Sequence, residues 1–161
     1  QIAIAGNDSV SYHKSKNAPK EGYGAEAMQY FKNIGVSNRV HMMGQLPFGV
    51  YRDLLRRSNL HCYFTRPYVL SWSLLESALT GCNLFVSNTK PVVEFLAESE
   101  GTTLVDYTSK DLGEKLLGTT LSIRNKPLSP FQLRKSRESL VEKVSAKNCI
   151  AQHFALASSL E

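Results

Sequence analysis

Two carboxylates within residues 65–94 carry the most suggestive chemistry of the sequence. Glu76 follows a stretch rich in hydroxyl and aromatic side chains, and Glu94 follows the next predicted strand. A carboxylate near the start of a helix does not suit a phosphate, but its oxygens accept hydrogen bonds from paired sugar or ribose hydroxyls. The sequence therefore predicts binding of a hydroxyl-rich ligand, and it assigns no catalytic residue.

The elements around Glu76 predict where such a ligand would lie. Residues 60–64 have the pattern of a short strand, and a helix opens between Ser71 and Ser73 and stops at Gly81. Residues 84–86 form a second apolar strand. In open α/β sheets, ligands bind at the carboxyl ends of parallel strands. The unpaired amides of the first helical turn, together with the helix dipole, favour an anion such as a diphosphate there.

The alternation of strands and helices extends over the rest of the chain. Further strands are predicted at 2–5, 40–44 and 101–105. Further helices are predicted at 25–34, 48–58, 91–97, 130–145 and 148–160, and another starts at Ser109 and carries Leu112, Leu116 and Leu117. Ser129 is a predicted cap, and Pro91 and Pro130 are predicted at the first helical position. Such alternation is typical of a parallel sheet covered on both faces. We predict one domain, 1–161, with an α/β, Rossmann-like three-layer α/β/α fold around a parallel sheet of about five strands.

The composition is that of an ordinary globular protein. Of the 161 residues, 42% are hydrophobic and 20% charged, and no run approaches the roughly 18 apolar residues of a membrane-spanning helix. The first residues predict a strand rather than a signal peptide, and the lack of an initiator Met predicts a piece of a longer protein. The net charge of +5 is spread over several segments, which argues against nucleic acid as a partner.

Two basic clusters and three cysteines receive structural interpretations. The clusters are Arg52, Arg56 and Arg57, and Arg134, Lys135 and Arg137. We interpret each as a solvated helix face, and the alternative is attraction to a phosphate substrate or an anionic membrane. Cys62, Cys82 and Cys149 lack metal-binding spacing, and two of them lie in or beside apolar strands. They predict buried, reduced thiols and no metal site.

The segment around Glu76 resembles a known family. It is similar to the donor-site segment of the retaining glycosyltransferases with two Rossmann-like domains, the GT-B architecture, within the large family four. The motif of that family continues from a Glu through Ala or Ser-Ala, two residues and Gly to a later Glu. Residues 76–81, Glu-Ser-Ala-Leu-Thr-Gly, and then Glu94 match this pattern. Tyr68 stands where an earlier Glu belongs, and Val69 and Ser71 replace the usual glycines, as in a bacterial subgroup that this run resembles.

The resemblance implies a nucleotide-sugar donor, UDP- or GDP-linked, and transfer of a hexose with retention of the anomeric configuration. It implies no metal, no cofactor and no assigned protein nucleophile. Glu76 would hold the ribose hydroxyls, and Tyr68 would offer its hydroxyl or ring face to the sugar. The amides that would face the sugar and phosphates belong to Val69, Leu70, Ser71 and Trp72. The remaining donor contacts would come from Glu94, Gly6, Gly44, Gln45 and Leu46, the last three along the base.

The resemblance also implies parts beyond this chain. Residues 1–161 would be the C-terminal donor domain. The N-terminal acceptor domain and the first strand of the donor domain, with the basic residues that grip the diphosphate, would precede them. This half alone would bind a donor without turnover. Such bacterial enzymes commonly build surface polysaccharides or glycolipids, so we expect a cytoplasmic protein, with peripheral attachment at the inner face of the membrane as an option.

Simpler interpretations of the same residues stay open. Ser73 and Glu76 have the spacing of a capping box, in which the Glu reaches back to the first amide of the helix. Trp72 would equally serve a hydrophobic core, Glu94 would equally cap its own helix, and His41 is more often packed or at an edge than catalytic. At the level of function, the alternatives are a sugar-nucleotide epimerase of the same architecture and a non-catalytic Rossmann-like interaction module.

Overall fold

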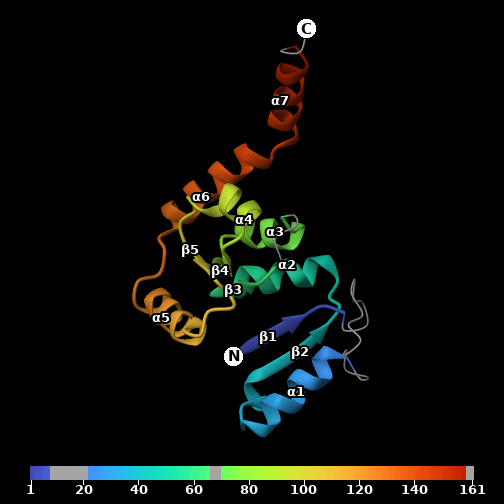
Figure 1. Cartoon of the computed structure of the whole chain (residues 1–161), viewed down its shortest axis with the longest axis vertical. Coiled ribbons are helices and arrows are strands. Elements are labelled where there is room, and N and C mark those ends of the chain that lie inside the picture. Colours follow the sequence, from blue (N-terminus) through green and yellow to red (C-terminus); the bar gives the residue numbers. More distant parts are fainter. Residues whose placement is uncertain (8–21, 66–69, 159–161) are drawn as a thin grey trace. The chain divides into compact units, whose positions relative to one another are not determined.

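The computed structural model describes residues 1–7, 22–65 and 70–158 (Figure 1). The chain divides into two compact units, Gln1–Tyr51 and Arg52–Glu161. Both units are built from parallel strands joined by helices. The α/β class with parallel strands is therefore confirmed.

The first unit is a strand, helix, strand crossover. Its elements are β1 (Ile2–Ala5), α1 (Tyr23–Asn33), the short 3-10 helix η1 (Ser37–Arg39) and β2 (Val40–Gly44). β1 and β2 pair in parallel, with Ile2 opposite Val40. A helical connection is what a parallel pair needs, because a tight turn joins only antiparallel strands. The next helix, α2 (Phe48–Arg57), contains the boundary between the units.

The second unit is a parallel sheet in the order β3, β4, β5, with helices between and after the strands. The strands are β3 (Leu60–Tyr63), β4 (Asn83–Ser87) and β5 (Thr102–Val105). The helices are α3 (Trp72–Thr80), α4 (Lys90–Leu96), α5 (Leu112–Asn125), α6 (Pro130–Val144) and α7 (Ala146–Ser158). Each of the first two helices thus returns the chain to the next parallel strand.

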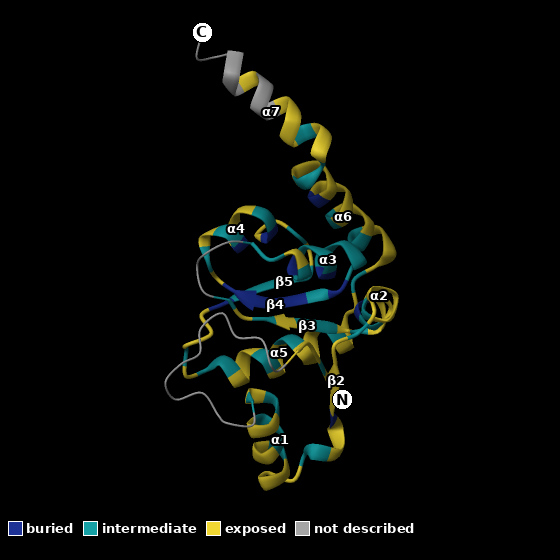
Figure 2. Ribbon diagram, turned by 90° about the vertical axis from the view of Figure 1, so that its right-hand side faces the viewer, coloured by how far each residue is buried: buried dark blue, intermediate teal, exposed yellow. Residues whose placement is uncertain are grey.

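The core of the second unit lies around β4, which has apolar side chains on both faces. Leu84 and Val86 pack on one face in a cluster with side chains of α3, α4 and α6, namely Leu74, Val92, Leu96 and Leu140. Phe85, fully buried, alternates to the other face. Figure 2 shows β4 in dark blue, with α3, α4 and α6 on one side of the sheet and α5 on the other. The second unit therefore has three layers.

The strands form two sheets, of two and three strands, instead of the single sheet of about five that the sequence predicts. Among the described residues, β1 pairs only with β2, and β3 pairs only with β4. Periodicity in a sequence identifies a strand from its own residues, but the partner of a strand lies far away in the chain. The number of strands was therefore predictable, whereas their grouping was not.

The ends of two helices test the predicted caps. Ser129 caps α6, and its side chain and that of Gln132 form a capping box, with Pro130 at the first helical position as predicted. α4 begins one residue earlier than predicted, at Lys90, so Pro91 stands at the second position. Thr89 is the N-cap there, because its extended backbone precedes the first helical residue.

Removal of the Phe85 ring, on the face of β4 opposite Leu84 and Val86, should destabilise the fold. We expect Phe85→Ala to lower the free energy of unfolding by about 3–5 kcal/mol, because it removes a buried ring and leaves a cavity. Urea denaturation followed by circular dichroism measures the change. Phe131→Ala is the matched control, since Phe131 is 75% exposed. Equal losses in the two variants would contradict the placement of the core.

Candidate functional site

The carboxyl ends of β3, β4 and β5 meet at one edge of the sheet. The parallel registers place Tyr63 opposite Val86, and Ser87 opposite Val105. The buried Ser87 hydroxyl accepts a hydrogen bond from the Thr65 amide at 2.8 Å, which ties the end of β3 to that of β4. This edge is where an open α/β sheet presents its binding groups.

The start of α3 supplies backbone donors beside this edge. Ser71 is the N-cap, and its carbonyl accepts the amides of Leu74 and Leu75, both at 3.2 Å. The Ser71 hydroxyl bonds to the Ser73 hydroxyl at 2.8 Å and does not cap the helix. The Trp72 amide, at the first helical position, has no intrahelical partner. These amides carry the positive end of the helix dipole.

The predicted capping box at Ser73 and Glu76 is wrong. The chain leaves the extended conformation at Ser71, so Ser73 already lies inside α3 and Glu76 is its fifth residue. From there a side chain cannot reach back to the N-cap amide, because a capping box needs the third helical position. The carboxylate of Glu76 is therefore not used to stabilise its own helix end.

Glu76 is half-buried, and no hydrogen bond or ion pair to its carboxylate is found among the described residues. Along α3 it follows Trp72 by four positions, so the two share a helical face. The buried side chains of α3, Leu74 and Ser77, lie on the opposite face. Glu76 is thus a carboxylate with free acceptor capacity on the side of α3 that faces away from the core.

Trp72 is 80% exposed, so its interpretation as a core residue is wrong. Two further aromatic side chains stand at the same edge of the sheet, which sequence reasoning missed. Phe64 follows β3 and Tyr107 follows β5, and their ring centroids are 6.2 Å apart. The Phe64 ring also meets buried Phe85 edge-on at 6.1 Å. No signal within either local sequence predicts this pairing, because it spans the width of the sheet.

The opposite end of α3 explains the spacing of Ser77, Ala78 and Gly81. Ser77 is fully buried and donates to the Ser73 carbonyl at 2.7 Å, where a larger side chain would collide with the core. Gly81 has φ of 83°, in the left-handed region, and ends the helix with its amide bonded to the Ala78 carbonyl. Arg137 from α6 donates to the Thr80 carbonyl at 2.8 Å. A Cβ on Gly81 would lie 2.5 Å from that guanidinium.

Glu94 lies exposed on α4, near the end of β4. Its interpretation as a cap of its own helix is wrong, because it is the fifth residue of α4 and that helix has no side-chain cap. Lys90, exposed at the first position of α4, places a positive charge at the same end of β4. Sequence reasoning did not single out Lys90, since one lysine at a helix start is common on solvated surfaces.

The predicted base-binding residues lie in the first unit. The Gly6 amide donates to the Gly44 carbonyl at 2.9 Å, so the carboxyl ends of β1 and β2 are brought together. Both glycines have positive φ, 147° and 62°. Gln45 and Leu46 follow directly, exposed and half-buried. This group belongs to a different unit from the group around Glu76.

The other predicted positions have plainer outcomes. Tyr68 and Val69 lie outside the described residues. Leu70 is half-buried and packs against the core cluster. His41 is exposed on β2. The prediction of buried thiols holds for Cys82, whereas Cys62 and Cys149 are exposed, and all three are thiols outside any disulfide.

Two carboxylates near the end of β5 accept hydrogen bonds from residues of their own loop. Hydrogen bonds from the Thr108 hydroxyl and amide lower the pKa of Asp106. A hydrogen bond from the Ser109 hydroxyl and then Lys115, 3.0 Å away, lower the pKa of Asp111. Their oxygens therefore already have partners, in contrast to those of Glu76.

Other site classes receive no support from the part of the chain that the structure describes. Within it, no cluster of three or more His, Cys, Asp or Glu side chains could hold a metal ion. No helix among the described residues is both long and apolar enough to cross a bilayer. A scan against models of known protein families finds no match, and a search of curated proteins also finds none.

Replacement of Gly81 should destabilise the C-terminal end of α3. We expect Gly81→Ala to lower the free energy of unfolding by about 1–2 kcal/mol from its left-handed backbone alone, with a further loss where the methyl group displaces Arg137. Urea denaturation measures the change. Gly118→Ala, within α5 and with no atom near its Cβ position, should be neutral or stabilising. A neutral Gly81→Ala would refute the close approach of α6.

The thiols should differ strongly in reactivity. Burial, and then the neighbouring Cys62, raise the pKa of Cys82 to about 12, so at pH 8 only about one thiol in 10,000 is ionised there. Because the thiolate is the nucleophile, iodoacetamide should label exposed Cys149 long before Cys82. Labelling of Cys82 should speed up about tenfold per pH unit below its pKa, and mass spectrometry follows it. Equal labelling of both in the folded chain would contradict this burial.

Proposed function

We propose that this chain is the nucleotide-sugar-binding domain of a retaining glycosyltransferase of the GT-B architecture. The observation that carries the proposal is the half-buried Glu76 carboxylate, which has no partner among the described residues and stands on the outward face of α3. Because no protein group occupies the oxygens of this carboxylate among the described residues, they are available to accept hydrogen bonds from a ligand. Ribose hydroxyls supply two in adjacent positions, which suits the two carboxylate oxygens.

The backbone at the start of α3 suits the diphosphate of such a donor. The amides near Trp72 present the positive end of the helix dipole, and Lys90 adds a full positive charge at the end of β4. The exposed ring of Trp72 offers an apolar face to a sugar. The donors expected are linked to UDP or GDP. Tyr68, Val69 and Glu94 complete the donor contacts of the proposal.

The reaction would transfer a hexose to a glycan, lipid or other acceptor. The bond from the anomeric carbon to the diphosphate oxygen breaks, and the acceptor oxygen forms a bond on the same face of the sugar. The acceptor proton passes to the departing diphosphate, so atoms and charges balance without a protein nucleophile, a metal or a cofactor. The contribution of this chain is to orient the donor and to stabilise the negative charge that grows on the diphosphate.

Each unit has part of the topology that a Rossmann-like donor domain requires. In the doubly wound order 3-2-1-4-5-6, strands 2 and 3 pair as β1 and β2 do, and strands 4, 5 and 6 pair as β3, β4 and β5 do. In the whole protein, an N-terminal domain would hold the acceptor site, and the protein would lie in the cytoplasm or at the inner face of the membrane.

Nucleotide titration of the chain tests the proposal. Calorimetry with UDP, GDP and ADP should give saturable binding of one nucleotide. Glu76→Gln should weaken that binding by about tenfold or more, because a hydrogen bond from ribose to a charged oxygen contributes about 1.5–3 kcal/mol. Glu142→Gln, an exposed position on α6, should leave it unchanged. Failure of all three nucleotides to bind, or equal affinity of the two variants, would refute the proposal.

A further inference from the structure

The hydroxyl of Thr102, at the start of β5, is buried and has no hydrogen-bond partner among the described residues. Buried hydroxyls in folded proteins are almost always paired, because an unpaired one has lost its hydrogen bonds to water without replacement. The amide of the same residue is satisfied by the Ser99 carbonyl at 3.1 Å. The side-chain hydroxyl of Thr102 therefore still needs a hydrogen-bond partner, whereas its amide does not.

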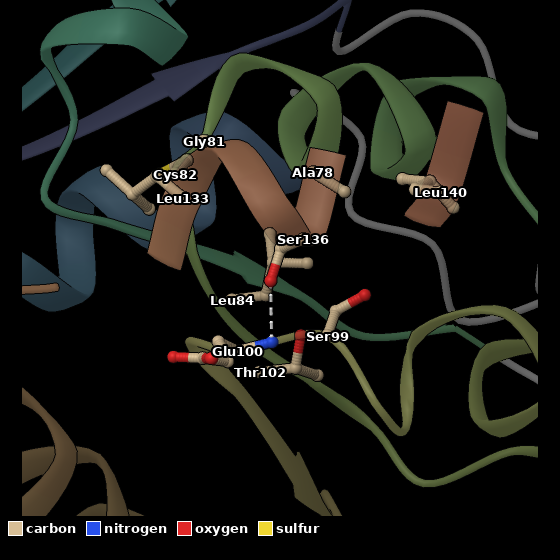
Figure 3. Close-up of a pocket in the computed structure, with 10 residues that line it drawn as sticks. All are labelled: Ala78, Gly81, Cys82, Leu84, Ser99, Glu100, Thr102, Leu133, Ser136 and Leu140. Carbon is tan, nitrogen blue, oxygen red and sulfur yellow. Dashed lines mark hydrogen bonds between the residues drawn. The ribbon is translucent and has the colours of Figure 1, made fainter. Parts of the chain in front are cut away.

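Thr102 lines a small cavity between the sheet and α6 (Figure 3). Its volume of about 10 Å³ is close to the least that holds one water molecule, and it is far too small for an organic ligand. Its walls come from the end of α3, the start of β4, the turn before β5 and one side of α6. They are formed by Ala78, Gly81, Cys82, Leu84, Ser99, Glu100, Thr102, Leu133, Ser136 and Leu140.

A second hydroxyl reaches this cavity from α6. Figure 3 shows Ser136 extending from α6 toward the turn before β5, where its oxygen accepts the Glu100 amide at 2.8 Å. One accepted bond leaves a serine hydroxyl with its proton and a second lone pair. A water needs two to four polar partners in a cavity of this size. The Thr102 and Ser136 hydroxyls provide two.

We propose that this cavity is a binding site for one structural water, held between the hydroxyls of Thr102 on β5 and Ser136 on α6. The water satisfies the Thr102 hydroxyl and joins the sheet to α6. It adds to direct hydrogen bonds of α6, from the Glu100 amide to Ser136, from Gln132 to the Glu100 carboxylate at 2.5 Å and from Arg137 to the Thr80 carbonyl. This site lies at the amino ends of β4 and β5, away from the donor edge, and does not depend on the proposed function.

Thr102→Val tests the site through the sign of the change in stability that it causes. Valine keeps the shape of threonine, so in a dry cavity it removes an unpaired hydroxyl and should stabilise the fold. With a bound water it removes one of that water's partners, and the unfolding equilibrium constant should rise roughly two- to tenfold. Thr103→Val, at the next position of β5, is the control for the exchange itself. An unfolding equilibrium constant of Thr102→Val that is lower than or equal to that of Thr103→Val would overturn the proposal.

Two further measurements test whether both hydroxyls contact one water. A double-mutant cycle of Thr102→Val with Ser136→Ala should show coupling between residues that share no direct hydrogen bond, because both contact one water. A crystal structure of the chain should show one ordered water within hydrogen-bond distance of both hydroxyls. Additive effects in the cycle, or a cavity without that water, would overturn the proposal.

Discussion

Burial of β4 on both faces is the constraint on which the second unit depends. A strand with Leu84 and Val86 on one side and Phe85 on the other has no face left for water, so helices must cover both. Pairing with β3 and β5 occupies both of its edges as well. The parallel register that results aligns the carboxyl ends of the three strands. The candidate donor site is therefore a consequence of how the core is closed.

α3 divides its length between packing and the candidate site. Its C-terminal end is held by buried Ser77, by the left-handed turn at Gly81 and by the Arg137 guanidinium from α6. Its N-terminal part carries Trp72 and Glu76 on the face opposite the core, where packing makes no demand on them. A helix fixed at one end can hold its other end in place, with donors and acceptors ready for a ligand.

Hydrogen bonding separates Glu76 from Asp106 and Asp111, two other carboxylates at the same edge. Asp106 and Asp111 accept hydrogen bonds within their own loop, which holds their charges without any ligand. Glu76 is partly desolvated and has no such partner among the described residues. The difference in hydrogen bonding, rather than in residue type, therefore leaves the oxygens of Glu76 available to a ligand.

The sequence by itself determined the strands, most helix boundaries, the α6 cap and the helix on which Glu76 stands, because each depends on neighbours within a few residues. It also led to Glu76, through the spacing of Glu76, Ala78 and Gly81. The structure then explained the last of these, because Gly81 ends α3. Only the tertiary structure decided that the strands form two sheets and that Trp72 is exposed. It alone decided that α3 begins directly after Ser71, which leaves Ser73 inside the helix, and that Phe64 meets Tyr107. Pairings between strands and ring contacts join residues far apart in the chain, where local patterns carry no information.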